Sequence, residues 1–284
     1  MDRIEYEQAL QSLTTAKESQ PELATMIDLQ YDLLKTISTA SLPQVEAGLT
    51  ADEVDQHVRQ GIPLLRGRAP QMKWEALFEL FTQVCRIIAQ HRPELAPHFD
   101  QFLYMLDHQP AKLTELFATY IENGEVALNA TATELGFSAS EEQSELLAFV
   151  FNQAAHPFLS AYAKTAFPLV NEQLWQQGYC PICGGEPDLA CLERSTRKRR
   201  LVCQRCDIAW LYPRIRCPFC NTSQPSDLAY FPVEDGKYRL YVCHRCKRYL
   251  KAVDLERAGR GVLFPVERIL TVPLDLAAKM EGYS

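Results

Sequence analysis

The cysteines constrain the fold of this chain more than any other feature. Nine of its ten cysteines lie between residues 180 and 246, and eight of them form C-x-x-C pairs. In a reducing compartment such clustering indicates metal binding rather than disulfide bonding. A C-x-x-C turn points two sulfurs at one place, and two such turns supply a tetrahedron of thiolates. The sequence therefore predicts two metal sites, one formed by Cys180, Cys183, Cys203 and Cys206 and one formed by Cys217, Cys220, Cys243 and Cys246.

An internal repeat indicates how the four pairs combine. Each half opens with Cys-Pro-x-Cys, continues through an Asp-Leu-Ala segment and reaches its second pair after a β-prone run. A unit duplicated this closely is expected to bind its metal within each copy, so we pair the first two turns and the last two. A crossed pairing stays open as the alternative. Tetrathiolate sites accept iron or zinc, and the spacing does not choose between them.

The predicted sites are closed, and this bears on what they do. All four positions around each metal are taken by protein, which leaves none for a substrate or an activated water, so hydrolytic metal catalysis is disfavoured. Thioredoxin-like redox motifs are also disfavoured, because they use one C-x-x-C at the start of a helix that follows a strand. Modules of about 40 residues lack the core to fold alone, and structural zinc can contribute on the order of 10 kcal/mol or more.

The part of the chain before residue 172 has a helical pattern. Between residues 74 and 88 the apolar side chains recur every three or four positions, which predicts a helix with one buried face: Trp74, Leu77, Phe78, Phe81, Val84, Cys85 and Ile88. A second helix is predicted from about residue 138, with Ser138 or Ser140 as its N-cap. Pro157 and Pro168 are expected to kink or divide it.

After Trp175 the composition changes to turn residues and short β-prone runs at 200–202, 209–212 and 238–242. A short helix is expected around residues 274–280. The predicted fold class is thus α+β, with an all-helical domain followed by two small rubredoxin-like or zinc-ribbon metal modules. The predicted domains are 1–172, 173–214, and 215–284, the last including a C-terminal tail.

Composition and charge narrow the functional classes. The net charge is −7 and 47% of the residues are hydrophobic, which favours an acidic globular protein and argues against bulk electrostatic binding to nucleic acid or anionic membranes. We find no secretory signal and no apolar run long enough to span a bilayer, so a cytoplasmic protein without membrane insertion is expected. No P-loop, G-x-S-x-G, H-E-x-x-H or G-x-G-x-x-G motif occurs.

The remaining candidate residues are interpreted as structural residues rather than as metal ligands, with the basic run left open. Cys85 and Cys191 are expected to be core residues, and His244 to be a solvated turn residue between two ligands. Pro157, after His156, is interpreted as a helix-terminal proline. A basic run lies where the first hairpin should turn, formed by Arg194, Arg197, Lys198, Arg199 and Arg200. It is open to three interpretations: a solvated tip, a contact for an acidic partner, or a contact for phosphate.

The second half resembles the formate dehydrogenase accessory proteins. The resemblance rests on the segments 178–184, 201–206 and 214–220, on Cys243-His-Arg-Cys246 with Tyr249-Leu-Lys251, and on the tail from Leu274-Asp275 to Gly282-Tyr283. It covers about 110 residues, and the helical half is consistent with it. One position departs from the family pattern, because Glu267 and Arg268 stand where the family has an Asp-Asp pair. If that pair contacts the partner, the partner surface of this chain differs.

The resemblance implies a function. Members of this family have two rubredoxin-like modules, described as binding iron. The proteins contact the catalytic subunit of formate dehydrogenase during its assembly and are not enzymes themselves. Two hypotheses from other classes stay open: a nucleic-acid-binding double zinc ribbon and a rubredoxin-like electron carrier. The acidic composition disfavours the first of these, and the long helical domain disfavours the second.

Overall fold

The computed structural model describes residues 1–40, 48–68, 74–134, 140–259 and 261–284. Within these ranges it describes only the backbone of Glu141, Glu142 and Asp235. The chain divides into two compact units. The first comprises residues 1–50, 63–168 and 182–184; the second comprises residues 51–62, 169–181 and 185–284. The predicted fold class, helical first and then a sheet bearing two four-cysteine clusters, is confirmed. That residues 1–172, 173–214 and 215–284 are separate domains stays a prediction.

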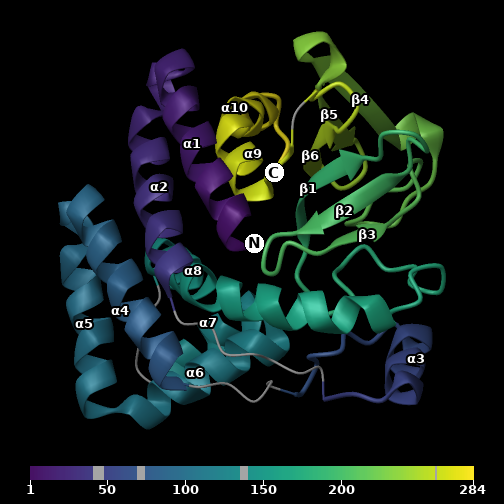
Figure 1. Ribbon diagram of the computed structural model, residues 1–284. Coiled ribbons are helices and arrows are strands. Elements are labelled where there is room, and N and C mark those ends of the chain that lie inside the picture. The colour runs from purple at the N-terminus through teal and green to yellow at the C-terminus, as the bar shows by residue number, and fades with distance from the viewer. Residues whose placement is uncertain (41–47, 69–73, 135–139, 260) are drawn as a thin grey trace. The chain divides into compact units, whose positions relative to one another are not determined.

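The first unit is built of helices (Figure 1). In chain order they are α1 (Arg3–Ser19), α2 (Ala24–Thr39), α4 (Trp74–His91), α5 (Ala96–His108), α6 (Pro110–Asn123), α7 (Glu125–Glu134) and α8 (Glu141–Ala166). Three of them meet at fully buried rings: Phe81 of α4, Phe117 of α6 and Phe151 of α8. Phe117 stacks on Phe151 at 4.1 Å, and both meet Phe81 edge-on at about 5.5 Å. These rings form the centre of the helical core.

The two helices predicted in this region are confirmed. Helix α4 buries Leu77, Phe81, Val84, Cys85 and Ile88 of the predicted stripe, whereas Trp74 and Phe78 are only partly buried. Ser140 caps α8 in a capping box with Gln143, whereas Ser138 lies outside the described residues. Pro157 does not divide the helix, because α8 continues from residue 141 to residue 166 with Pro157 inside it, and the alternative, a kink at Pro157, stays a prediction. Pro168 comes after the end of α8. No helix in the described part of the chain is both long and apolar enough to cross a membrane.

The second unit contains one mixed sheet in strand order β3-β2-β1-β6-β5-β4 (Figure 1). The strands are β1 (Pro187–Leu192), β2 (Arg199–Cys203), β3 (Ala209–Leu211), β4 (Leu228–Val233), β5 (Tyr238–Cys243) and β6 (Tyr249–Asp254). Each repeat forms an antiparallel meander of three strands. The meanders join through β1 and β6, which pair in parallel from Leu189 opposite Lys251 to Leu192 opposite Asp254. The repeats therefore share one sheet.

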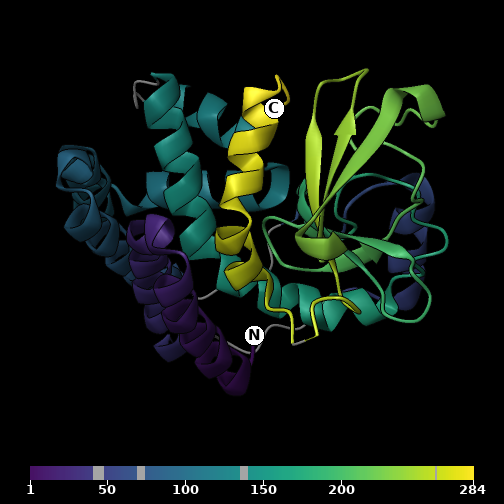
Figure 2. The same ribbon diagram turned by 90° about the horizontal axis from the view of Figure 1, so that it is seen from above.

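Helices complete the second unit. Helix α3 (Ala51–Gln60) belongs to it, and the chain after β6 forms α9 (Phe264–Leu270) and α10 (Val272–Met280). The predicted helix at 274–280 is confirmed by α10, whereas α9 was not predicted. Figure 2 shows α9 and α10, in yellow, running beside the strands of the second repeat. Ala278 of α10 packs with Leu240 and Val242 of β5, so the C-terminal helices cover the apolar face of that repeat.

Two motifs that carry the family resemblance, Tyr249-Leu-Lys251 and Leu274-Asp275, contact each other in this packing. The hydroxyl of Tyr249 donates to Asp275 at 2.8 Å, and the ammonium of Lys251 donates to its other carboxylate oxygen at 2.7 Å. The C-terminal residue Ser284 hydrogen-bonds with the backbone of Lys247 and Tyr249. The Tyr-Leu-Lys segment and the Leu-Asp of the tail thus fix α10 against the start of β6.

Candidate metal centres

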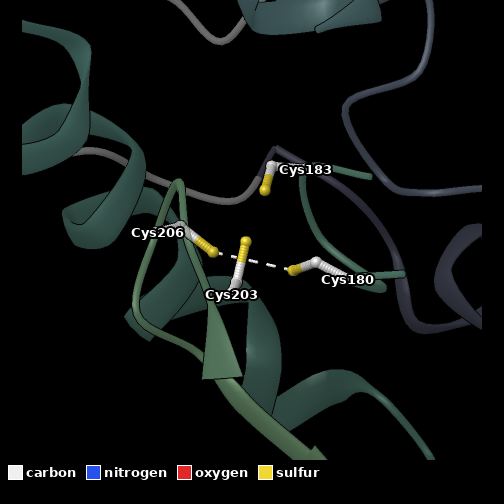
Figure 3. Close-up of side chains that lie close together, drawn as sticks. All are labelled: Cys180, Cys183, Cys203 and Cys206. Carbon is white, nitrogen blue, oxygen red and sulfur yellow. Dashed lines mark hydrogen bonds between the residues drawn. The ribbon is translucent and has the colours of Figure 1, made fainter. Parts of the chain in front are cut away.

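The four C-x-x-C turns, called knuckles one to four in chain order, bring their eight cysteines into two clusters, and each cluster contains the four cysteines of one repeat. Within each cluster all four sulfurs lie within 4.8 Å of one another. Figure 3 shows the sulfurs of Cys180, Cys183, Cys203 and Cys206 pointing toward a common centre. The structure thus brings together every cysteine predicted for a site and groups them by repeat, in place of the crossed alternative.

The sulfur spacing fits a tetrahedral metal. The sulfurs of Cys180 and Cys206 are 3.6 Å apart in the first cluster. In the second, Cys217 and Cys246 are 3.7 Å apart, and Cys220 and Cys243 are 3.6 Å apart. Four sulfurs each about 2.3 Å from one ion would be separated by roughly 3.8 Å along each tetrahedral edge. A disulfide would require about 2 Å. Each cluster can therefore hold one metal ion, and its donor set suits iron or zinc.

The four knuckles share one backbone conformation. In each, the N–H of the first cysteine donates to the carbonyl five residues later, at distances of 2.8 to 3.0 Å. The residue after the second cysteine has a positive φ in every case: Gly184 (71°), Asp207 (61°), Asn221 (61°) and Lys247 (58°). Three of these positions have the residue types that favour this region, namely Gly, Asp and Asn. The turn closes by itself and presents both sulfurs on one side.

Gly185 allows the chain after the first knuckle to pack closely against Cys203, a ligand from the second knuckle. A Cβ placed on Gly185 would lie 2.9 Å from the sulfur of Cys203 and 2.9 Å from Cδ of Arg205. The flexible Arg205 side chain can move, but a metal-bound sulfur cannot move without leaving the ion. Only a residue without a Cβ therefore fits beside the Cys203 ligand in this conformation.

We expect Gly185→Ala to make metal release from the first site at least about tenfold faster, since a distortion of about 1.4 kcal/mol corresponds to a factor of ten. Release to a chromophoric chelator measures it directly. Gly261→Ala is the matched control, because a Cβ there meets no atom within 4 Å. Equal release rates for the Gly185 variant and the wild type would contradict the close approach to Cys203.

The second cluster is more accessible than the first. All four cysteines of the first cluster are buried, whereas Cys220 and Cys246 of the second are only partly buried. Burial raises the pKa of the Cys217 thiol and of the Cys246 thiol. Burial also acts to raise that of Cys220, but hydrogen bonds from the Thr222 backbone and the neighbouring thiols lower its pKa overall. Because thiolates are the ligands, metal binding must release protons and weaken as the pH falls.

Arg268 contacts the second knuckle, Cys203 to Cys206, through hydrogen bonds and ion pairs. Its guanidinium pairs with Asp188 at 2.5 Å and with Asp207 at 2.6 Å, and it donates to the carbonyl of Cys203 at 3.1 Å. Its neighbour Glu267 is fully buried and accepts a hydrogen bond from Tyr238 at 2.8 Å. Whether these two positions change a partner surface stays untested. The structure shows both side chains engaged inside the second unit, where they support the sheet and the first metal site.

The basic run is not a patch of free cations. Arg197 forms a two-pronged pair with the buried Asp254. Arg200 pairs with Glu172 and Glu193. Arg199 is buried and donates to backbone carbonyls. The run does lie where β1 turns into β2, as predicted. However, two of its five charges, those of Arg197 and Arg200, are neutralised by carboxylates of the second unit, so the run as a whole gives less support to a contact with phosphate or with an acidic partner.

The other cysteines and His244 lie where expected. Cys85 and Cys191 are buried and outside both clusters, and burial raises the pKa of these thiols to about 12 and about 11. Cys191 packs with Leu189, Val202 and Tyr238 in the sheet core. His244 is exposed, and its Nδ1 lies 2.9 Å from the hydroxyl of Tyr283. His156 and Pro157 lie inside α8, so the expected helix-terminal proline is wrong.

Fold and site together define a class of protein: a helical unit combined with a duplicated sheet that carries two four-cysteine metal centres. A scan against protein-family models finds no match. The chain is 24% identical over 286 residues to the FdhE homolog of Aquifex aeolicus, which covers 98% of this chain and 92% of that protein.

Two further relatives match over a shorter region. The FdhE homolog of Stutzerimonas stutzeri is 30% identical over 111 residues, and protein FdhE of Escherichia coli O1:K1 is 28% identical over 113 residues. Each of these matches covers 38% of this chain and 36% of the relative. The crystal structure of the FdhE protein from Pseudomonas aeruginosa has the same fold, with a TM-score of 0.65 over the whole chain and 94% of that structure, at 18% identity. The predicted resemblance is confirmed by these likenesses.

Proposed function

We propose that this chain is an accessory protein for the maturation of formate dehydrogenase. In this role it binds the catalytic subunit in the cytoplasm, is not itself an enzyme, and carries two metal ions, with iron favoured and zinc as the alternative. The similarity to FdhE proteins along 98% of the chain carries the proposal, because it includes the helical unit as well as the cysteine-rich part.

The geometry of the centres supports a binding role. Cys180, Cys183, Cys203 and Cys206 would hold one ion and Cys217, Cys220, Cys243 and Cys246 the other, with the sulfur spacing given above. A tetrathiolate stabilises its module, and with iron it can also exchange one electron. Four protein ligands leave no coordination position for a substrate. The metal centres are therefore proposed to keep a partner-binding surface rigid.

Deletion of the gene should leave the formate dehydrogenase catalytic subunit synthesised but formate oxidation lost. A plasmid copy of the wild-type gene should restore the activity, and so should Cys191→Ala, whose cysteine lies in the sheet but outside both clusters. The Cys243→Ala copy should fail. A tagged wild-type protein should recover the catalytic subunit, and the Cys243→Ala protein much less of it. Unchanged activity in the deletion strain, with no catalytic subunit recovered, would refute the proposal.

A further inference from the structure

A small groove lies beside the second metal centre. Arginines and aromatic rings line it next to the ligands Cys217 and Cys243, and its cavity volume is about 30 Å³. The lining residues used below are Arg199, Arg214, Arg216, Phe219, Tyr241 and Arg248. A water needs about 10 to 15 Å³ of such volume, so the groove has room for about two oxygen atoms.

Two residues that line this groove each have a buried polar atom without a hydrogen-bond partner among the described residues. Arg199 is only 3% exposed, and one of its terminal nitrogens donates to the carbonyls of Pro213 and Arg216. In the part of the chain that the structure describes, its Nε is buried without a hydrogen-bond partner, and so is the hydroxyl oxygen of Tyr241. The Tyr241 ring lies 5.4 Å from the Arg199 guanidinium. Because leaving such groups unsatisfied is costly, a groove lined by two residues with orphan donors points to a ligand that accepts hydrogen bonds.

The charges around the groove specify the ligand further. Among the ion pairs of the described residues, none involves Arg199, Arg214 or Arg216. Arg248 pairs with Glu186 and covers the Phe219 ring at 3.7 Å. A tetrathiolate with a divalent ion carries a net charge of about −2, which three guanidinium charges exceed. The groove therefore keeps a positive surplus even with the second site loaded, and this favours an anion.

We propose that this groove binds a carboxylate. Two carboxylate oxygens match its volume and can accept from Arg199 Nε and from the Tyr241 hydroxyl. Arg214 and Arg216 attract the charge, and the Phe219 and Tyr241 rings contact the rest of the molecule. The carboxylate comes from one of two sources: a free small acid such as formate, or an acidic side chain of a bound protein segment. The proposal does not depend on the maturation role.

The test uses the full-length, zinc-loaded protein with ¹⁵N-labelled arginine, followed by NMR of the Nε–H signals at constant ionic strength. Titration with formate or acetate should shift the Arg199 signal saturably, whereas the neutral isostere acetamide should not. Tyr241→Phe should weaken binding about tenfold, the effect of losing one hydrogen bond to a charged group. It removes only the orphan hydroxyl, so it stays informative if Arg199→Lys misfolds. Arg216→Gln should weaken binding severalfold.

The same carboxylate titrations provide a control variant and identify the results that would overturn the proposal. Arg86→Gln removes an exposed charge from α4, outside the groove, and should bind like the wild type. A blocked Glu-containing peptide that binds at least tenfold tighter than acetate, with its Gln counterpart silent, identifies a protein segment as the source; otherwise the source is a free acid. No saturable shift with any carboxylate, or equal binding by Tyr241→Phe, Arg216→Gln and the wild type, overturns the proposal.

Discussion

Replacing Cys180 or Cys243 with alanine is expected to remove one metal ion and to unfold the repeat that held it, while the helical unit keeps its structure. Each repeat has only three short strands, and a structural metal ion supplies roughly 10 kcal/mol or more to such a module. The helical unit has its own buried core around Phe81, Phe117 and Phe151 and does not need the ion.

Metal analysis and far-UV circular dichroism together measure this effect. The variants should hold about one ion per chain, lose β signal and keep most of the helical signal. Cys191→Ala is the control, since Cys191 is buried in the sheet but belongs to neither cluster, and it should keep both ions. Full occupancy in either ligand variant would show that the substituted cysteine is not a ligand.

The second large effect is expected at Arg268. Its substitution by methionine leaves Asp188 and Asp207 without their shared cation and removes the hydrogen bond to the carbonyl of the ligand Cys203. The three side chains are 14 to 29% exposed, and removing one partner from a buried pair typically costs about 3–5 kcal/mol. We therefore expect Arg268→Met to lower the free energy of unfolding of the second unit by about 3 kcal/mol or more, and to speed metal loss from the first site.

Urea unfolding of the metal-loaded protein, followed by the sheet signal, measures this loss. Arg3→Met is the matched control, because the one ion pair of Arg3 among the described residues is an exposed pair with Glu7 on α1, and such pairs contribute less than about 1 kcal/mol. If Arg268→Met stayed within about 0.5 kcal/mol of the wild type, the role of Arg268 in holding the second knuckle would be wrong.

Local patterns in the sequence were enough to predict the cysteine clusters and helix α4. The ligand spacing defines each knuckle within a few residues, and the duplication indicates which knuckles combine. The apolar stripe of α4 repeats with the period of one helix face, so its buried side chains follow from the sequence. In both cases the information lies within a short stretch of chain.

The joining of the repeats through β1 and β6 could not be predicted in this way. Both strands are central in the sheet and buried along nearly their whole length, so they lack the alternation that marks a half-buried strand. β4 contains Pro232, which is tolerated because β4 is an edge strand. Parallel pairing of strands about 60 residues apart in sequence also leaves no local signal.

The role of Arg268 was missed for a related reason. Its partners Asp188 and Asp207 lie 80 and 61 residues earlier in the chain, and nothing near Arg268 in the sequence indicates them. The ion pairs of the basic run were not predicted, because its carboxylate partners, Glu172 and Asp254 among them, lie outside the first hairpin. Charge patterns read along one segment cannot show ion pairs with distant segments.

The metal content of protein purified without oxygen tests the central claim most directly. Eight thiols in two tetrahedral clusters predict two metal ions per chain, with iron favoured, and none of the eight cysteines open to thiol reagents in the folded state. One ion per chain, with four of these cysteines freely titratable in the folded protein, would contradict the account.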